Sequence, residues 1–160
     1  MHRLLIAAMT ATLAACSPRV DATEVQDIPE QPMTAAHLAD LIAADGAGHT
    51  VAVLTGPAAP NGLDPVFASI ATGDPAWLDV APLLRSAVDG KYAEGLADAL
   101  SRALPINPVG VLTALNASGG ASELTCEATD DPTLIAAVEG VADPALQAVK
   151  ADCLEYLRAG

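Results

Sequence analysis

Apolar residues recur at helical spacing along most of the chain that follows Met33. After Pro75 they occupy the i, i+3, i+4 and i+7 positions of one buried helix face, at Trp77, Val80, Ala81, Leu84 and Val88. Pro82 lies within this segment, and we expect it to kink or divide the helix because it cannot donate a backbone hydrogen bond. The same spacing predicts helices near residues 92–104 and 107–115, and a last helix with a common face of Leu146, Val149, Cys153 and Leu157.

Helix starts are marked by a short polar residue followed by proline. The polar side chain caps an unpaired backbone amide, and proline fits the first helical position because it has no amide to leave unpaired. Five such pairs occur, Asp64-Pro65, Asp74-Pro75, Asn107-Pro108, Asp131-Pro132 and Asp143-Pro144. Thr34 is expected to cap an earlier helix that ends at Gly46.

The segment Thr-Val-Ala-Val-Leu-Thr at residues 50–55 has the β-branched composition of a strand. A lone strand has no partner to pair with, so we expect a short buried helix there. Together the elements predict an all-α fold with one disulfide, either an irregular bundle of about seven short helices or a set of stacked helical hairpins. The proline pairs are unevenly spaced, so no sequence repeat of fixed period is indicated.

Composition favours helices that approach one another closely. Hydrophobic residues make up 52% of the chain and aromatic residues only 2%, so the core has to be built from aliphatic side chains. The net charge of -13 disfavours a nucleic-acid partner, because like charges repel. The acidic residues are scattered, which is typical of a solvated surface and leaves a site for a basic partner as the alternative.

The N-terminus has the layout of an export signal. A positive tip at Arg3 precedes about ten mostly apolar residues, too few to span a bilayer. They lead into Leu13-Ala14-Ala15-Cys16, which resembles the lipobox of bacterial lipoprotein precursors in all four positions. The resemblance covers the signal alone. It implies that residues 1–15 are removed and that the thiol of Cys16 is joined to lipid, an anchor that two or three acyl chains make effectively permanent.

We expect the chain to divide into three parts. The resemblance makes residues 1–15 the signal peptide and Cys16 the lipidated N-terminus. The polar, acidic and proline-bounded composition up to residue 32 predicts a tether, and the length of residues 33–160 predicts a single helical domain. In Gram-negative lipoproteins, Ser after the lipid-bearing Cys usually accompanies transfer to the outer membrane. Ser17 therefore implies a bacterial envelope protein that is anchored by lipid to the outer membrane and faces the periplasm.

Two stretches of the helical domain carry a second resemblance. They are Gly-Asp-Pro-Ala-Trp-Leu at residues 73–78 and Asn-Pro-Val-Gly-Val-Leu at residues 107–112. The region that contains them is similar to small exported helical proteins of proteobacteria whose function is unknown. This resemblance attaches no activity to the domain.

Cys126 and Cys153 are the two cysteines that remain once Cys16 carries lipid. Disulfides persist in exported proteins, so we expect these two residues to be paired. Pairing would close a loop of about 28 residues and stabilise the fold by about 3.5 kcal/mol in the chain-entropy model. Two buried free thiols are the alternative.

No catalytic set is predicted from the motifs. The serines lie outside the Gly-x-Ser-x-Gly and Ser-x-x-Lys patterns of serine hydrolases. His37 and His49 have no Cys or His at metal-ligand spacing, so we expect surface histidines and neither a metal site nor a cofactor. Trp77 is either a core residue or a contact for a protein partner, since Trp is enriched in interface hot spots.

Two classes of function follow from these features. The leading hypothesis is a non-enzymatic envelope lipoprotein whose domain binds an unidentified envelope protein, as an accessory factor or as an inhibitor of the immunity-protein kind. The alternative is an enzyme or small-ligand carrier with a pocket between helices. Such a pocket needs convergent polar groups around an apolar cavity, for example His37 or His49 facing two carboxylates.

Overall fold

The computed structural model describes residues 32–59 and 61–159, and residues Pro32–Gly160 make up one compact unit. Within the described ranges the chain forms eight α-helices, one short 3₁₀ helix and no strand. The helices are α1 (Ala35–Asp45), α2 (Ala47–Leu54), α3 (Asp64–Ile70), α4 (Pro75–Arg85), α5 (Gly90–Ala103), α6 (Pro108–Ala117), α7 (Pro132–Glu139), η1 (Pro144–Leu146) and α8 (Gln147–Leu157). The expected all-α fold is confirmed. The signal peptide, Cys16 and all of the tether except Pro32 lie outside the described residues.

Most of the predicted caps form. At each cap a side-chain oxygen accepts a hydrogen bond of 2.8 to 2.9 Å from a backbone amide two or three residues later. The capping residues are Asp74, Asn107, Asp131 and Asp143. Thr34 caps α1 in the same way, with its hydroxyl accepting from the amide of His37 at 3.2 Å. Asp143 begins η1, which runs directly into α8.

One expectation from proline is wrong, and a second is wrong in part. Helix α3 is capped one residue earlier than predicted, at Leu63, and Asp64 makes no capping hydrogen bond. Leu63 is fully buried and its carbonyl accepts from the amide of Phe67, so packing of a leucine sets this helix start. Helix α4 runs through Pro82 without being divided. Of the two effects expected at Pro82, a kink or a division, the division is therefore wrong.

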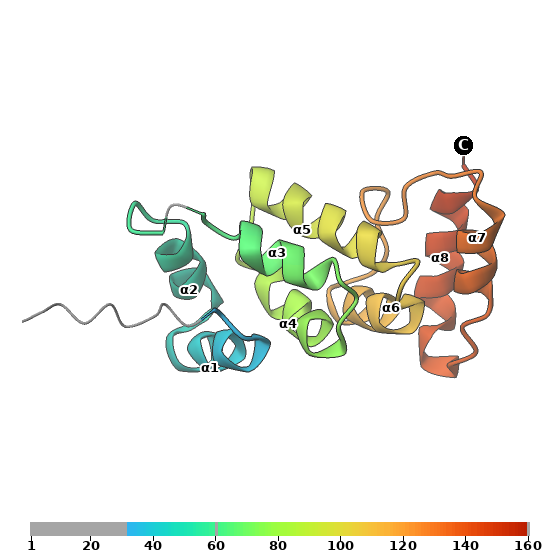
Figure 1. The fold of residues 1–160 in the computed structure, drawn as a ribbon. Coiled ribbons are helices and arrows are strands. Elements are labelled where there is room, and N and C mark those ends of the chain that lie inside the picture. The colour runs from blue at the N-terminus through green and yellow to red at the C-terminus, as the bar shows by residue number, and fades with distance from the viewer. Residues whose placement is uncertain (1–31, 60, 160) are drawn as a thin grey trace, which may run out of the picture. The chain divides into compact units, whose positions relative to one another are not determined.

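Consecutive helices pack in pairs, as stacked hairpins do (Figure 1). Contacts join α1 to α2, α3 to α4, α5 to α6, and α7 to α8. The pairs are linked in chain order, because α4 contacts α1 and α6, and α6 contacts α8. Both descriptions that the sequence left open, a helical bundle and stacked hairpins, therefore agree with the contacts of this domain.

The core is aliphatic, as composition requires. Its fully buried members include Leu38, Leu63, Ile70, Leu84, Leu104, Val111, Leu112 and Val138. Close approach between α3 and α5 depends on Gly95, where an added Cβ would lie 2.8 Å from Cε2 of Phe67. The single phenylalanine of the chain is thus packed against helix backbone.

A disulfide joins the loop before α7 to α8. Cys126 precedes α7 and Cys153 lies in α8; their sulfurs are bonded, their Cα atoms are 5.3 Å apart and both side chains are fully buried. The amide of Thr129 also donates to the carbonyl oxygen of Leu157 at 2.9 Å. The predicted pairing is therefore present in the structure.

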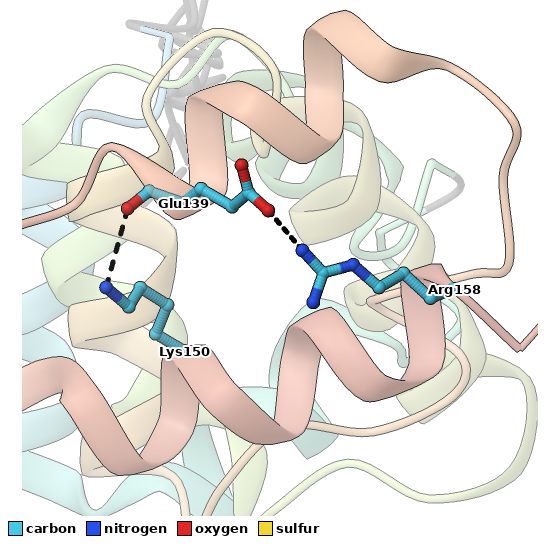
Figure 2. Close-up of polar contacts among 3 residues, drawn as sticks. All are labelled: Glu139, Lys150 and Arg158. Atoms are coloured by element: carbon cyan, nitrogen blue, oxygen red, sulfur yellow. Dashed lines mark hydrogen bonds and ion pairs between the residues drawn. The ribbon is translucent and has the colours of Figure 1, made fainter.

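Polar contacts across α7 and α8 reinforce this pair (Figure 2). Nζ of Lys150 donates to the carbonyl oxygens of Val141 at 2.9 Å and of Glu139 at 3.4 Å. The guanidinium of Arg158 pairs with the carboxylate of Glu139. Lys150 thus places a positive charge at the C-terminal end of α7, where helix carbonyls are unpaired and the helix dipole is negative.

Candidate functional site

The helix pair α1–α2 carries the candidate site. Both helices share Gly46 as a cap, and the backbone there has φ of 83°. That conformation is strained for any residue with a Cβ, so glycine permits α1 to end and α2 to begin at one position. The amide of Gly46 also donates to the carbonyl oxygen of Ile42 at 2.9 Å, which closes the last turn of α1.

Helix α2 forms from the segment that has strand-like composition. Thr50 and Thr55 donate their hydroxyl hydrogens to the carbonyl oxygens of Gly46 and Val51, at 3.0 Å and 2.8 Å. These bonds satisfy side chains that would otherwise compete with the helix. Thr50 and Val51 are buried, whereas Val53 is 57% exposed. The predicted buried helix is therefore confirmed as a helix, with one face buried and the other open.

A groove of ≈ 240 Å³ lies between the two helices on this open side. Its walls come from one face of each helix, at Leu41, Asp45, His49, Thr50, Val53 and Leu54. Thr50 is buried at the base, while Asp45 and His49 are exposed and lie on the solvent side. The surface that lines the groove is mainly apolar, and its aliphatic residues are Leu41, Val53 and Leu54.

The part of the chain that contains the groove is acidic. The described residues before Arg85 include five exposed aspartates and no Lys or Arg, the aspartates being Asp40, Asp45, Asp64, Asp74 and Asp79. With no basic side chain among them, the summed field of this part of the chain is negative.

The groove offers little to a chemical reaction. His49 lines it together with a single carboxylate, Asp45, whereas the enzyme alternative calls for two. The hydroxyl of Thr50 is already engaged with a backbone carbonyl. Across residues 32–59 and 61–159, no group of three or more His, Cys, Asp or Glu side chains gathers as a metal site. The arrangement is suited to contact with an apolar group beside a positive charge.

The residues singled out from the sequence lie in different places. Cys126 and Cys153 form the disulfide at the C-terminal pair. Trp77, in α4, is half-buried and packs against the hydrophobic core, and the fully buried residue of that turn is Leu78. Cys16 lies outside the described residues. His37 is exposed on α1 and does not line the groove.

The sequence did not reveal the groove itself. Residues 51–54, Val-Ala-Val-Leu, are apolar on every side of a helix, and that surplus over one buried face was the available signal. Among the described residues, no helix is both long enough and apolar enough to cross a membrane.

No family model, curated protein or solved structure matches this chain. The function is therefore argued from the chain's own residues.

Proposed function

We propose that this protein is a bacterial lipoprotein that is tethered to the envelope through Cys16 and acts by binding another protein. The observation that carries the proposal is the lipobox-like run Leu13-Ala14-Ala15-Cys16 behind a short apolar segment. Ser17 favours the outer membrane with the domain in the periplasm. There the domain meets exported proteins and proteins that enter from outside, which suits an accessory factor or an immunity-like inhibitor.

The α1–α2 groove supports a binding role over that of a carrier. Pockets that enclose small ligands usually measure about 300 to 1,000 Å³. The groove, at ≈ 240 Å³, lies below that range and has exposed walls at Asp45 and Val53. Its dimensions suit one or two side chains of a protein partner better than a whole metabolite.

The anchor is tested by replacing Cys16 with Ser and labelling cells with a radioactive fatty acid. A hydroxyl is a far weaker nucleophile than a thiol, so we expect Cys16→Ser to take up no label and to accumulate as uncleaved precursor. The matched control is Ser17→Ala, which leaves the thiol in place and should be labelled like the parent chain. Equal labelling of Cys16→Ser and the parent would overturn the lipoprotein proposal.

The binding role is tested by crosslinking in living cells and recovery of the lipidated protein. We expect a stoichiometric protein partner whose yield falls at high salt, because screening weakens attraction to the acidic surface. A variant with Ala at the exposed residues Asp89, Glu94 and Asp98 should recover less partner. Absence of any partner, together with a hydrolytic activity that His49→Ala abolishes, would replace this proposal with the enzyme alternative.

A further inference from the structure

We infer that the α1–α2 groove receives an apolar side chain from a basic, amphipathic segment of the partner protein. The inference rests on the proposed function and adds to it the place of contact and the chemistry of the partner. An apolar stripe of a helix that lies in a groove is a recurrent mode of peptide recognition.

The packing of α2 leaves one of its apolar faces exposed. Val51 and Val53 lie in the same short helix, yet Val51 is 8% exposed and Val53 is 57% exposed. Among the described elements, α2 contacts α1 and α4, and these contacts leave the Val53 face uncovered. Leu41 on α1 and Leu54 on α2 continue that face into the groove. A partner side chain placed there removes apolar surface from water on both molecules, at about 25 cal/mol for each Å².

The charge of the chain indicates the chemistry of the partner. Asp45 lines the groove, residues 32–84 contain aspartates but no Lys or Arg, and the whole chain has a net charge of -13. A Lys or Arg beside the inserted side chain therefore meets a complementary field.

Charge also argues against two other occupants. The chain's own residues 16–31 contain four acidic residues and a single basic residue, Arg19, so the acidic surface beside the groove would repel them. A second copy of this chain carries the same acidic surface and the same disadvantage.

The test places a photo-crosslinking amino acid, p-benzoylphenylalanine, at position Val53 of the full chain in living cells. The matched control carries it at Leu124, which is 61% exposed but lies in the loop before α7. We expect a covalent adduct from position 53 and none from position 124. Mass spectrometry should show that the captured peptide has an apolar residue with Lys or Arg within four positions.

A charge variant makes the test quantitative. In the chain labelled at position 53, Asp45→Asn should lower the adduct yield about 2- to 5-fold, the ratio expected for one exposed ion pair. Asp152→Asn, on α8, removes an equally exposed carboxylate away from the groove and should leave the yield unchanged. If the labelled chain fails to accumulate, the crosslinker is placed at Leu41 on the opposite wall.

Four outcomes would overturn the inference. They are an adduct at position 124 but not at positions 53 or 41, capture of an acidic peptide, capture of residues 16–31, and capture of a second copy of this chain. A partner that is recovered by general crosslinking but not from the groove refutes this inference and leaves the proposed function standing. Recovery of no partner by either route refutes both.

Discussion

The side-chain amide of Asn107 donates a 3.0 Å hydrogen bond to the carbonyl oxygen of Gly73, 34 residues earlier in the chain. Its Oδ1 accepts from the amide of Gly110 at 2.9 Å, so the same side chain caps α6 and joins two interhelical turns. Gly73 has φ of 73°, and a Cβ there would lie 2.9 Å from Cγ2 of Ile106. The contact therefore depends on Asn at one position and Gly at the other.

Replacing Asn107 should separate its two roles. Asn107→Asp keeps the acceptor for Gly110 and loses the donor to Gly73, whereas Asn107→Ala loses both. We expect the free energy of unfolding to fall by about 1 kcal/mol for Asp and about 2 kcal/mol for Ala, measured by urea denaturation. The control is Asp143→Ala, which removes a cap with a single hydrogen bond and should lower the free energy of unfolding by about 1 kcal/mol. Equal losses for Asn107→Ala and Asp143→Ala would contradict the joining role.

Two glycine substitutions should have opposite signs. Gly48 lies in α2 with nothing within 4 Å of an added Cβ, so Gly48→Ala should raise the free energy of unfolding by about 0.5 to 1 kcal/mol. In α6, a Cβ on Gly110 would lie 2.6 Å from Cδ1 of Leu78, so Gly110→Ala should lower it by about 1 to 3 kcal/mol. Thermal unfolding of the two variants beside the parent checks both signs. A stabilising Gly110→Ala would mean that α4 and α6 are packed less closely than described.

The disulfide predicts that oxidised protein contains no reactive thiol at Cys126 or Cys153. Alkylation of the folded protein without reductant, followed by mass spectrometry, should leave both residues unmodified. Reduction under denaturing conditions before alkylation is the control and should modify both. Labelling of both residues in the folded, unreduced protein would show that the bond is absent.

The same bond predicts a reductant-dependent stability. Reducing the parent protein should lower its free energy of unfolding by about 3.5 kcal/mol, because the unfolded chain regains the freedom of a loop of about 28 residues. The double variant Cys126→Ala/Cys153→Ala should unfold at one urea concentration with or without reductant. A parent protein that unfolds identically in both conditions would refute this role.

Lys150 and Arg158 should contribute unequally to the C-terminal pair. Lys150→Met removes a charged, half-buried donor from two backbone carbonyls and should cost about 1 kcal/mol of unfolding free energy. Arg158→Gln removes an ion pair whose side chains are 50% exposed, and exposed pairs contribute about 0 to 1 kcal/mol. Urea denaturation in low and high salt separates them, since the contribution of the more exposed Arg158 ion pair should fade more with screening. A greater loss for Arg158→Gln would reverse this order.

Local signals predicted the elements well. An Asp or Asn before Pro predicts a helix start from local properties alone. The side-chain oxygen can cap a backbone amide, and the φ of proline is already fixed, so the helices that follow Asp74 and Asn107 were predicted correctly. The exception, Asp64, follows Leu63, whose complete burial is a property of the assembled core and is not visible in the local sequence. Counting cysteines likewise predicted the pairing of Cys126 with Cys153, because two candidates allow one intramolecular bond.

The candidate site was harder to predict because it depends on which face of α2 is left uncovered by other helices. Val51 and Val53 are chemically identical, and only the positions of α1 and α4 decide which of them is covered. Trp77 shows the same limit, since helical spacing assigned it to the buried face while Leu78 takes the fully buried position. Asn107 was recognised as a cap, but its bond to Gly73 spans two turns that the sequence does not bring together.

The contacts of α1 and α2 have a consequence for how the domain opens. Within the described elements this pair reaches the remaining helices through α4 alone, whereas α8 is joined by a disulfide to the loop before α7. Proteins open in cooperative pieces, and a piece with few attachments detaches at a lower free energy than the whole fold. Amide hydrogens of α1 and α2 should then exchange with solvent earlier than those of α8. An occupant that bridges the two helices of the groove should then slow this exchange without touching the rest of the domain.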